Sequence, residues 1–129
     1  NMGIKLTGVK EAVARLKGIE RVTPTALADA LYVEGELIMT TSKRSWVPVD
    51  LGTLRASGRV ERPRISGSNV SVELGFGGAA AAYALIQHER TDFNHPGQGR
   101  AKYLEGPVKE AAPTIGRKIA RRLQRAWGR

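Results

Sequence analysis

The sequence predicts a single α+β domain, with a long N-terminal helix and a basic C-terminal helix packed on a small twisted, mainly antiparallel sheet. Two segments repeat apolar residues with the period of a helix, whereas the middle of the chain alternates apolar and polar residues as a half-buried strand does. The 129 residues are enough to bury one core of moderate size. This length excludes a multidomain enzyme.

A short helix is the first element expected, over residues 8–17. Apolar residues recur in it at spacings of four and three, at Val9, Val13 and Leu16. Thr7 can cap its start, and Gly18 is the kind of residue that ends a helix.

A long helix is expected next, over residues 24–43. Thr23 can accept a hydrogen bond from a free backbone amide, and Pro24 suits the first helical position because its missing N–H costs nothing there. Gly35 would cost about 1 kcal/mol relative to alanine, so it predicts a close backbone approach or a local bend. The acids Asp29, Glu34 and Glu36 lie mostly off the apolar stripe, which consists of Leu27, Ala30, Leu31, Val33, Leu37 and Ile38.

The chain is expected to turn after Trp46 and to enter a sheet region over residues 57–89. Pro48 disfavours helix at the residue before it. Residues 59–65 are compatible with a strand that Pro63 confines to an edge or to a strand end, and residues 70–76 alternate as a second strand. The turn-forming residues 66–69 between them predict an antiparallel hairpin with one face on the helices.

The last third of the chain predicts a strand or short helix, a loop and a helix. Residues 83–89 fit either of the first two, and residues 90–100 form a long polar loop of a kind that is often functional. Pro107 and Pro113 restrict where the helix can start, so its regular part is expected over residues 114–127. Its apolar stripe is Ile115, Ile119, Leu123 and Trp127.

Catalytic, metal and cofactor sites are not predicted. His88, Glu89, Asp92 and His95 lie close together in the sequence, but the spacing of the two histidines matches no helical ligand pair. Paired carboxylates and a serine nucleophile motif are both missing, and cysteine is absent from the sequence. We therefore expect a protein that is not an enzyme and that has no cofactor; the alternative is a hydrolase that uses His88 or His95.

Positive charge is concentrated at the C-terminal end. The chain carries 21 Lys and Arg against 12 Asp and Glu, a formal charge of +9, and residues 117–129 hold six of the basic residues and no acid. This basic face predicts either contact with nucleic-acid phosphates or with an acidic partner, or a solvated surface. We expect charge reversal at Arg121 and Arg122 to leave the fold intact. The candidate contacts are Arg117, Lys118, Arg121, Arg122 and Arg125.

Two classes of partner are disfavoured. Few aromatic residues occur, and none forms a stacking series, so sequence-specific nucleic-acid recognition is not expected. The longest uncharged run, after residue 75, is mostly Gly and Ala and is far shorter than the roughly 20 apolar residues of a membrane span.

Three blocks carry a resemblance to a known family. Residues 47–58, VPVDLGTLRASG, are similar to the "VPVDTGxLRxS" signature of the neck and tail-completion (head–tail joining, or putative tail-component) proteins of long-tailed bacteriophages. Residues 83–89, YALIQHE, resemble the family's "YAxYVHE" segment, and residues 95–105, HPGQGRAKYLE, resemble its "HPxGQxKYLExP" segment. Leu51 stands where threonine is usual, and the second block is less aromatic than the family pattern.

The resemblance implies a structural virion protein that joins the phage head to its tail. It would belong to a ring of six or twelve copies around the DNA passage, at the neck or tail end of the virion and in the host cytoplasm before assembly. Adjacent connector or tail proteins would be its partners, with non-specific contact to genomic DNA. The alternative is a small non-specific DNA-binding accessory protein that uses the basic C-terminal helix.

Candidate contacts between subunits follow from the matched blocks and the polar loop. Asp50 can form an Asx turn or a helix cap, and Arg55 can bond Asp50 or an acid of a neighbouring subunit. Phe93 would anchor the polar loop, which is expected to make contacts after assembly. The full set is Trp46, Asp50, Arg55, Phe93 and His95.

Overall fold

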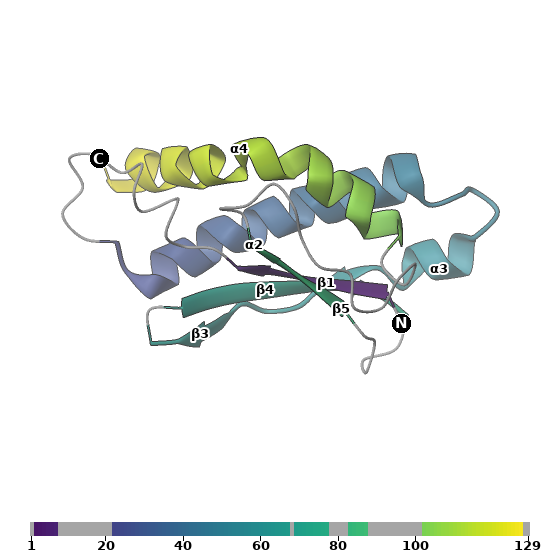
Figure 1. The fold of residues 1–129 in the computed structure, drawn as a ribbon, viewed down its shortest axis with the longest axis horizontal. Coiled ribbons are helices and arrows are strands. Elements are labelled where there is room, and N and C mark those ends of the chain that lie inside the picture. The colour runs from purple at the N-terminus through teal and green to yellow at the C-terminus, as the bar shows by residue number, and fades with distance from the viewer. Residues whose placement is uncertain (1, 8–21, 68, 78–82, 88–101, 128–129) are drawn as a thin grey trace.

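In the computed structural model, two long helices lie on one face of a five-stranded sheet (Figure 1). The structure describes residues 2–7, 22–67, 69–77, 83–87 and 102–127. The helices α2 (Pro24–Thr41) and α4 (Lys102–Trp127) run antiparallel in this layer. This arrangement confirms the predicted α+β class, while the helix predicted over residues 8–17 lies outside the described residues.

The sheet has the order β2-β4-β1-β5, and β3 pairs with β4 outside this path. Its strands are β1 (Met2–Thr7), β2 (Arg59–Val60), β3 (Arg64–Ser66), β4 (Asn69–Phe76) and β5 (Tyr83–Gln87). All pairings are antiparallel except that of β1 with β5, which is parallel. The strand β1 was not predicted, and Thr7 ends this strand.

The predicted hairpin is present as β3 and β4. Ser66 pairs with Asn69 across the turn, and Gly67 has a φ of +62°, which favours glycine. Pro63 lies between β2 and β3, where its missing N–H interrupts neither strand. Residues 83–87 form a strand, which decides between the two predicted alternatives for that segment.

Helix α2 begins as predicted. The Thr23 hydroxyl accepts a hydrogen bond from the Ala26 amide at 3.1 Å, and Pro24 occupies the first turn. The helix ends at Thr41, two residues earlier than expected, and continues as a π-helical turn, η1 (Ser42–Trp46). Gly35 is explained by close approach to the sheet, since a Cβ there would lie 3.3 Å from Cγ1 of Val72.

The buried face of α2 differs from the predicted stripe. Val33 and Leu37 are 37% and 47% exposed, so their predicted burial is wrong. The helix packs on both the sheet and α4. Its buried face therefore also includes Ala28, Gly35 and Met39. Val33 and Leu37 are thereby left on the outer side. The predicted stripe residues that are buried are Leu27, Ala30, Leu31 and Ile38.

Helix α4 begins at Lys102, twelve residues before the predicted start. Proline at 107 removes the N–H that would pair with the Tyr103 carbonyl. The hydroxyl of Ser42 in η1 donates a hydrogen bond of 2.5 Å to this carbonyl instead. Pro113 lies on the exposed side of the helix. Because a side chain from another element supplies the missing bond, the helix runs through Pro107.

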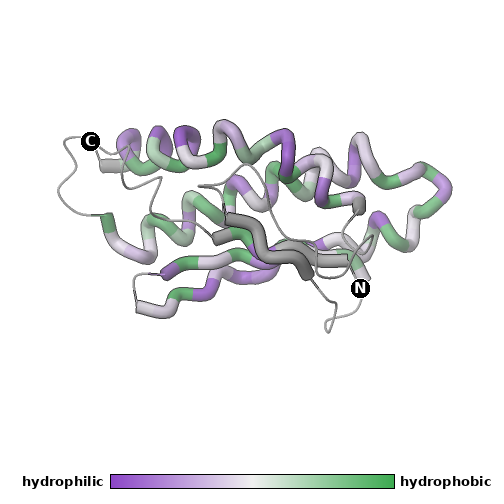
Figure 2. The backbone as a smooth tube through the Cα atoms, viewed as in Figure 1, coloured by the Kyte–Doolittle hydropathy of each residue, from purple (hydrophilic) through white to green (hydrophobic). Residues whose placement is uncertain are grey.

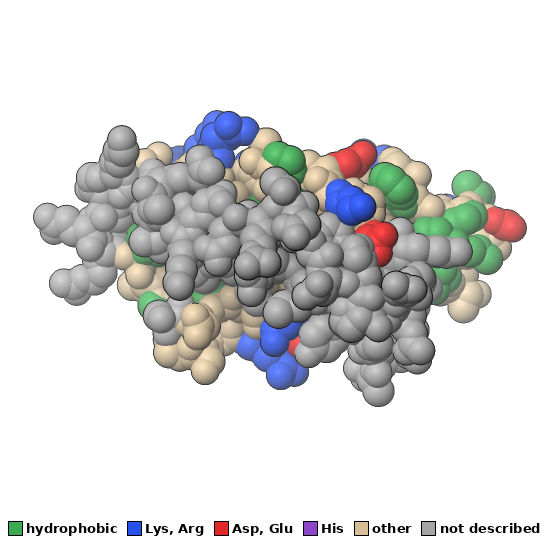
Figure 3. All heavy atoms as spheres, in the orientation of Figure 1, with side chains coloured by type: hydrophobic (Ala, Val, Ile, Leu, Met, Phe, Trp, Pro, Cys, Tyr) green, Lys and Arg blue, Asp and Glu red, His purple; other side chains and the backbone are tan. Residues whose placement is uncertain are grey.

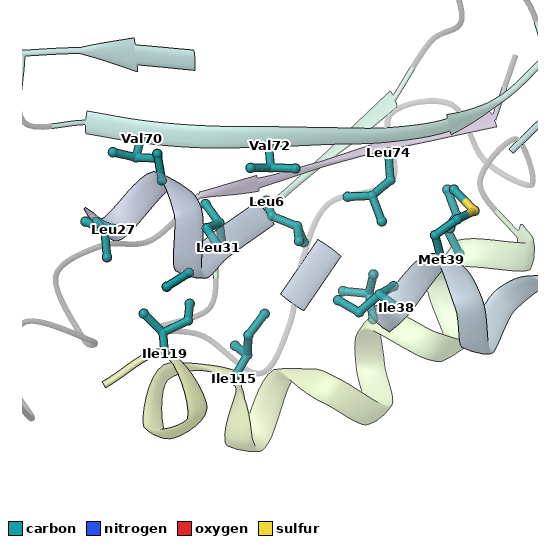
Figure 4. Close-up of a cluster of buried hydrophobic side chains, with 14 of the residues drawn as sticks. Leu6, Leu27, Leu31, Ile38, Met39, Val70, Val72, Leu74, Ile115 and Ile119 are labelled. Atoms are coloured by element: carbon teal, nitrogen blue, oxygen red, sulfur yellow. The ribbon is translucent and has the colours of Figure 1, made fainter. Parts of the chain in front are cut away.

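The core lies between the sheet and the two helices. Figure 4 shows Leu31 and Ile38 of α2 between Val72 of β4 and Ile115 of α4. Phe76 and Leu104 are fully buried near the start of α4 and the end of β4. The apolar period of α4 continues toward its N-terminus from the predicted stripe, through Val108. Among the helices of the described ranges, none has the length and apolar character needed to cross a bilayer.

Candidate functional site

The block VPVDLGTLRASG forms most of a projecting corner, which we define as residues 46–56. Val47 is buried, and the chain then turns through a hydrogen bond of 3.0 Å from the Leu51 amide to the Pro48 carbonyl. A short helix, α3 (Gly52–Ala56), follows, with Leu51 as its cap residue and no side-chain cap. The predicted capping role of Asp50 is therefore wrong, because backbone groups close this turn.

The corner exposes large apolar side chains. Val49 is 83% exposed, Trp46 is 39% exposed and Leu51 is 38% exposed. Asp50, also exposed, lies between Val49 and Leu51. Hydrophobic side chains gather at the right-hand end of the molecule in Figure 3, where Figure 1 places the connection from α2 to α3. The corner is therefore an apolar surface that carries one acid.

The indole of Trp46 lies against the first turns of α4. A Cβ atom on Gly106 would approach three carbons of the indole to between 2.2 and 2.6 Å. Only glycine leaves room for this ring at position 106. Trp46 thus joins η1 to α4 and fixes the base of the corner.

Substitution of Gly106 tests this contact. Gly106→Ala is expected to displace the indole, to lower the free energy of unfolding by about 1–3 kcal/mol, and to shift Trp46 emission to the red. In a Trp127→Phe background Trp46 is the remaining tryptophan, so urea unfolding followed by fluorescence measures both effects. Gly52→Ala is the control, since a Cβ there meets no atom within 4 Å. Equal effects of the two substitutions would contradict the contact.

Arg55, near the end of the corner, is hydrogen-bonded to Val47 near its start. Its Nη2 donates to the Val47 carbonyl at 3.4 Å, so the acceptor of this bond is a backbone group and not Asp50. Its Nε is buried and has no hydrogen-bond partner among the described residues. A bond from Arg55 to an acid of a neighbouring subunit stays a prediction.

The structure thus brings three predicted contact residues, Trp46, Asp50 and Arg55, to one corner. Phe93 and His95 lie outside the described residues, as do the other members of the polar cluster around them. In the part of the chain that the structure describes, no group of three or more His, Asp or Glu side chains could hold a metal ion.

The basic face of α4 is a second candidate surface. Arg117, Lys118, Arg121 and Arg125 are exposed, and at 100° per residue they fall on the side of the helix away from the buried residues. Figure 2 shows hydrophilic residues recurring along these last turns. Residues 114–127 carry five basic residues and no acid, whereas residues 102–113 carry two of each sign. The C-terminal half of α4 is therefore a continuous cationic surface.

Arg122 is not part of this exposed face. Its Nε donates to Oε2 of Glu34 at 2.7 Å, and the Glu34 side chain is 3% exposed. Sequence reasoning placed Glu34 mostly off the apolar stripe, but it lies three residues after Leu31 and four before Ile38. That spacing was the available signal for its burial. Arg122 thus compensates a buried carboxylate while its side chain remains 37% exposed, and its role as a contact to DNA or to an acidic partner stays a prediction.

A groove of about 180 Å³ runs between α2 and α4. Its apolar lining includes Leu37 and Ile38 of α2 and Pro107 and Ala111 of α4. Lys118 also lines it, and so does the carboxylate-bearing residue Glu34. This groove arises from the packing of two helices far apart in the sequence, which the sequence analysis did not predict.

Among the described residues, Tyr32 is the group whose pKa departs from its ordinary value. A hydrogen bond to Glu36, burial and the charge of Glu36 raise the pKa of its phenol above 10.0, while Arg62 opposes the shift. The phenol is therefore neutral at pH 7. Because the folded state favours the neutral phenol, the interactions that raise its pKa stabilise the fold below pH 10. This stabilisation is lost as the phenol ionises at higher pH.

Comparisons with protein-family models, curated proteins and solved structures give no match to this chain.

Proposed function

We propose that this protein is a structural component of a bacteriophage virion that completes the tail or neck and joins head to tail as part of a ring around the DNA passage. The exposed apolar corner carries this proposal. Its sequence is the block that resembles the head–tail joining family, and Val49 at its tip is 83% exposed. Exposed apolar clusters of this kind mark protein–protein contacts.

Three interactions hold the corner in place before any partner binds. The Ser42–Tyr103 hydrogen bond, the packing of Trp46 on Gly106 and the Arg55–Val47 hydrogen bond all fix its base. A surface ordered before binding loses less conformational entropy on association. This geometry suits a protein that acts by assembly and not by catalysis.

The basic face supports a place beside a polyanion. Four exposed cations on the C-terminal half of α4 would attract the phosphates of genomic DNA in the passage, or an acidic surface of an adjoining ring. The copies, six or twelve in number, would contact one another head to tail, since ring closure requires such interfaces. The protein would lie in the host cytoplasm before assembly and at the neck or tail end afterwards.

The test combines solution mass with particle composition. Sedimentation across a range of concentrations is expected to show closed assemblies of six or twelve copies. Disruption of the coding sequence is expected to yield heads and tails that do not join, and mass spectrometry is expected to find the chain in intact particles. A chain that is monomeric at every concentration and absent from purified particles would refute the proposal.

A second candidate function, non-specific DNA binding by a monomer, is favoured by the basic face alone. The triple variant R117E/R121E/R125E is expected to abolish salt-dependent binding to random duplex DNA. Four phosphate contacts would give a slope of about −3.6 in log K against log salt, since each contributes about −0.9. The control R44E/R62E/R64E changes the net charge equally at exposed positions outside α4. Equal loss in both variants would show that net charge, and not this face, is responsible.

A further inference from the structure

The corner and the basic face of α4 expose different kinds of side chain. The corner presents large apolar groups, with Val49 at its tip, and one acid, Asp50. The basic face presents four exposed cations and no acid. Among the side chains that the structure describes, every large apolar one that is exposed lies outside α4. The two surfaces are therefore suited to different classes of partner.

The composition of the basic face matches nucleic acid more closely than protein. Contacts between proteins are built around an apolar centre with a polar rim. The described residues from 113 to 126 offer no such centre, because those exposed beside the four cations are Pro113, Gln124 and Ala126. Interfaces with nucleic acid are more polar and much more positively charged.

The charges of the basic face are available to an external anion. Its four exposed cations form no ion pair with another residue of the described ranges, whereas Arg122 beside them is bonded to Glu34. The preceding acid in the sequence is Glu110, about two helical turns before Arg117. An anion that approaches this face therefore does not compete with a carboxylate of the described chain.

Three arginines of the basic face form a row along the helix. Arg117, Arg121 and Arg125 follow one another at intervals of four residues, which is about 6 Å along the helix axis. One strand of duplex DNA carries a phosphate about every 3.4 Å of its axis, so each arginine can reach a phosphate of its own. The planar guanidinium groups suit this role because they bond two phosphate oxygens at once.

The basic face and the corner lie at opposite ends of the molecule. Figure 1, drawn with the longest axis horizontal, places the end of α4 at the left and α3, which belongs to the corner, at the right. A polyanion bound along the last turns of α4 therefore leaves the corner open to a protein partner.

We infer that the basic face binds the phosphate backbone of duplex DNA, while the corner at the other end stays free for contacts with protein. This inference rests on the proposed function, because it assigns the end of the subunit that faces the DNA passage. In the ring, the last turns of α4 would point inward and the corners would lie away from the DNA. Phosphate contacts carry no sequence information, so DNA of any sequence could pass.

Single substitutions measure the individual phosphate contacts. Each of R117Q, R121Q and R125Q is expected to weaken binding to random duplex DNA and to reduce the slope of log K against log salt by about 0.9. R44Q removes the same charge at an exposed position outside α4 and is expected to leave the slope unchanged. Fluorescence anisotropy of a labelled duplex between about 50 and 200 mM salt gives these slopes. Unchanged slopes in the three α4 variants would overturn the inference.

Competition distinguishes phosphates from the carboxylates of an acidic protein. Duplex DNA carries a charge about every 1.7 Å, about twice the density of an extended polyglutamate chain. Polyglutamate at equal charge concentration is therefore expected to displace the labelled duplex much less than unlabelled duplex does. Equal displacement by the two polymers would assign the basic face to an acidic protein and would overturn the inference.

Site-specific labels test the separation of the two ends. The chain contains no cysteine, so Q124C and V49C each carry one thiol for an environment-sensitive fluorophore. Saturation with duplex DNA is expected to change the emission at position 124 and to leave that at position 49 unchanged. An equal response at both positions would contradict the assignment of the two ends.

Sedimentation separates this inference from the proposed function. If the wild type forms closed rings while the α4 variants keep the wild-type salt slope, the DNA contact is wrong and the ring proposal stands. If the α4 variants lose slope while the chain is monomeric at every concentration and absent from particles, the DNA contact stands and the ring with its inward-facing helices is refuted.

Discussion

Replacing Arg122 by glutamate is expected to lower the free energy of unfolding by about 3 kcal/mol or more. The Glu34 side chain is 3% exposed and its carboxylate is bonded to Arg122. Removal of the partner of a buried carboxylate leaves an uncompensated charge, which costs about 3–5 kcal/mol where both members are buried. Arg122 is 37% exposed, which reduces this cost, but the second carboxylate of the glutamate variant adds repulsion. Chemical denaturation monitored by circular dichroism measures the loss. This result would reverse the expectation, drawn from the sequence, that charge reversal at Arg121 and Arg122 is harmless to the fold.

The neighbouring residue provides the control. Arg121→Glu makes the same change in charge at an exposed position and is expected to cost no more than about 0.5 kcal/mol. Replacing both members of the pair, as Glu34→Met with Arg122→Met, is expected to recover most of the stability, because an apolar pair needs no compensation. Equal stability of the Arg121 and Arg122 variants would show that the ion pair contributes nothing.

Ser42→Ala is expected to lower the free energy of unfolding by about 1–3 kcal/mol, since it removes the hydrogen bond from a buried hydroxyl to the Tyr103 carbonyl. Ser42 is fully buried, so water does not readily replace the hydroxyl. The effect should depend on residue 107. In a Pro107→Ala background the new backbone N–H can bond Tyr103 within the helix, and the cost of losing the hydroxyl is expected to fall by about 1 kcal/mol.

Denaturant unfolding of the four proteins in this cycle gives the coupling energy directly. Ser45→Ala, in the same π-helical turn but exposed, is the control and is expected to change stability little. An unchanged cost of Ser42→Ala in the two backgrounds would mean that the hydroxyl does not substitute for the missing proline N–H.

Local signals in the sequence predict some elements of the fold well. Thr23 and Pro24 define the start of α2 because capping depends on neighbouring atoms alone. Strand β1 escaped prediction because Ile4 and Leu6 give a period of two over too few residues. The early start of α4 depends on Ser42, a residue of another element, so local reasoning about Pro107 could not anticipate it.

The candidate surfaces were predictable to different degrees. The corner residues were identified by their resemblance to a family, and the exposed cations of α4 by charge and period. Glu34 and Arg122 are far apart in the sequence, so their pairing appears only when α2 and α4 pack together. The groove has the same origin, because its lining comes from both helices.

The position of β1 has a consequence for folding. This strand lies inside the sheet, paired with β4 on one side and β5 on the other, although both partners come much later in the chain. Neither pairing can form until the chain has closed a long loop, and non-local strand pairing of this kind slows folding. A nascent chain that ends before β4 would therefore leave the apolar side of α2 without its sheet, and such intermediates are prone to aggregate.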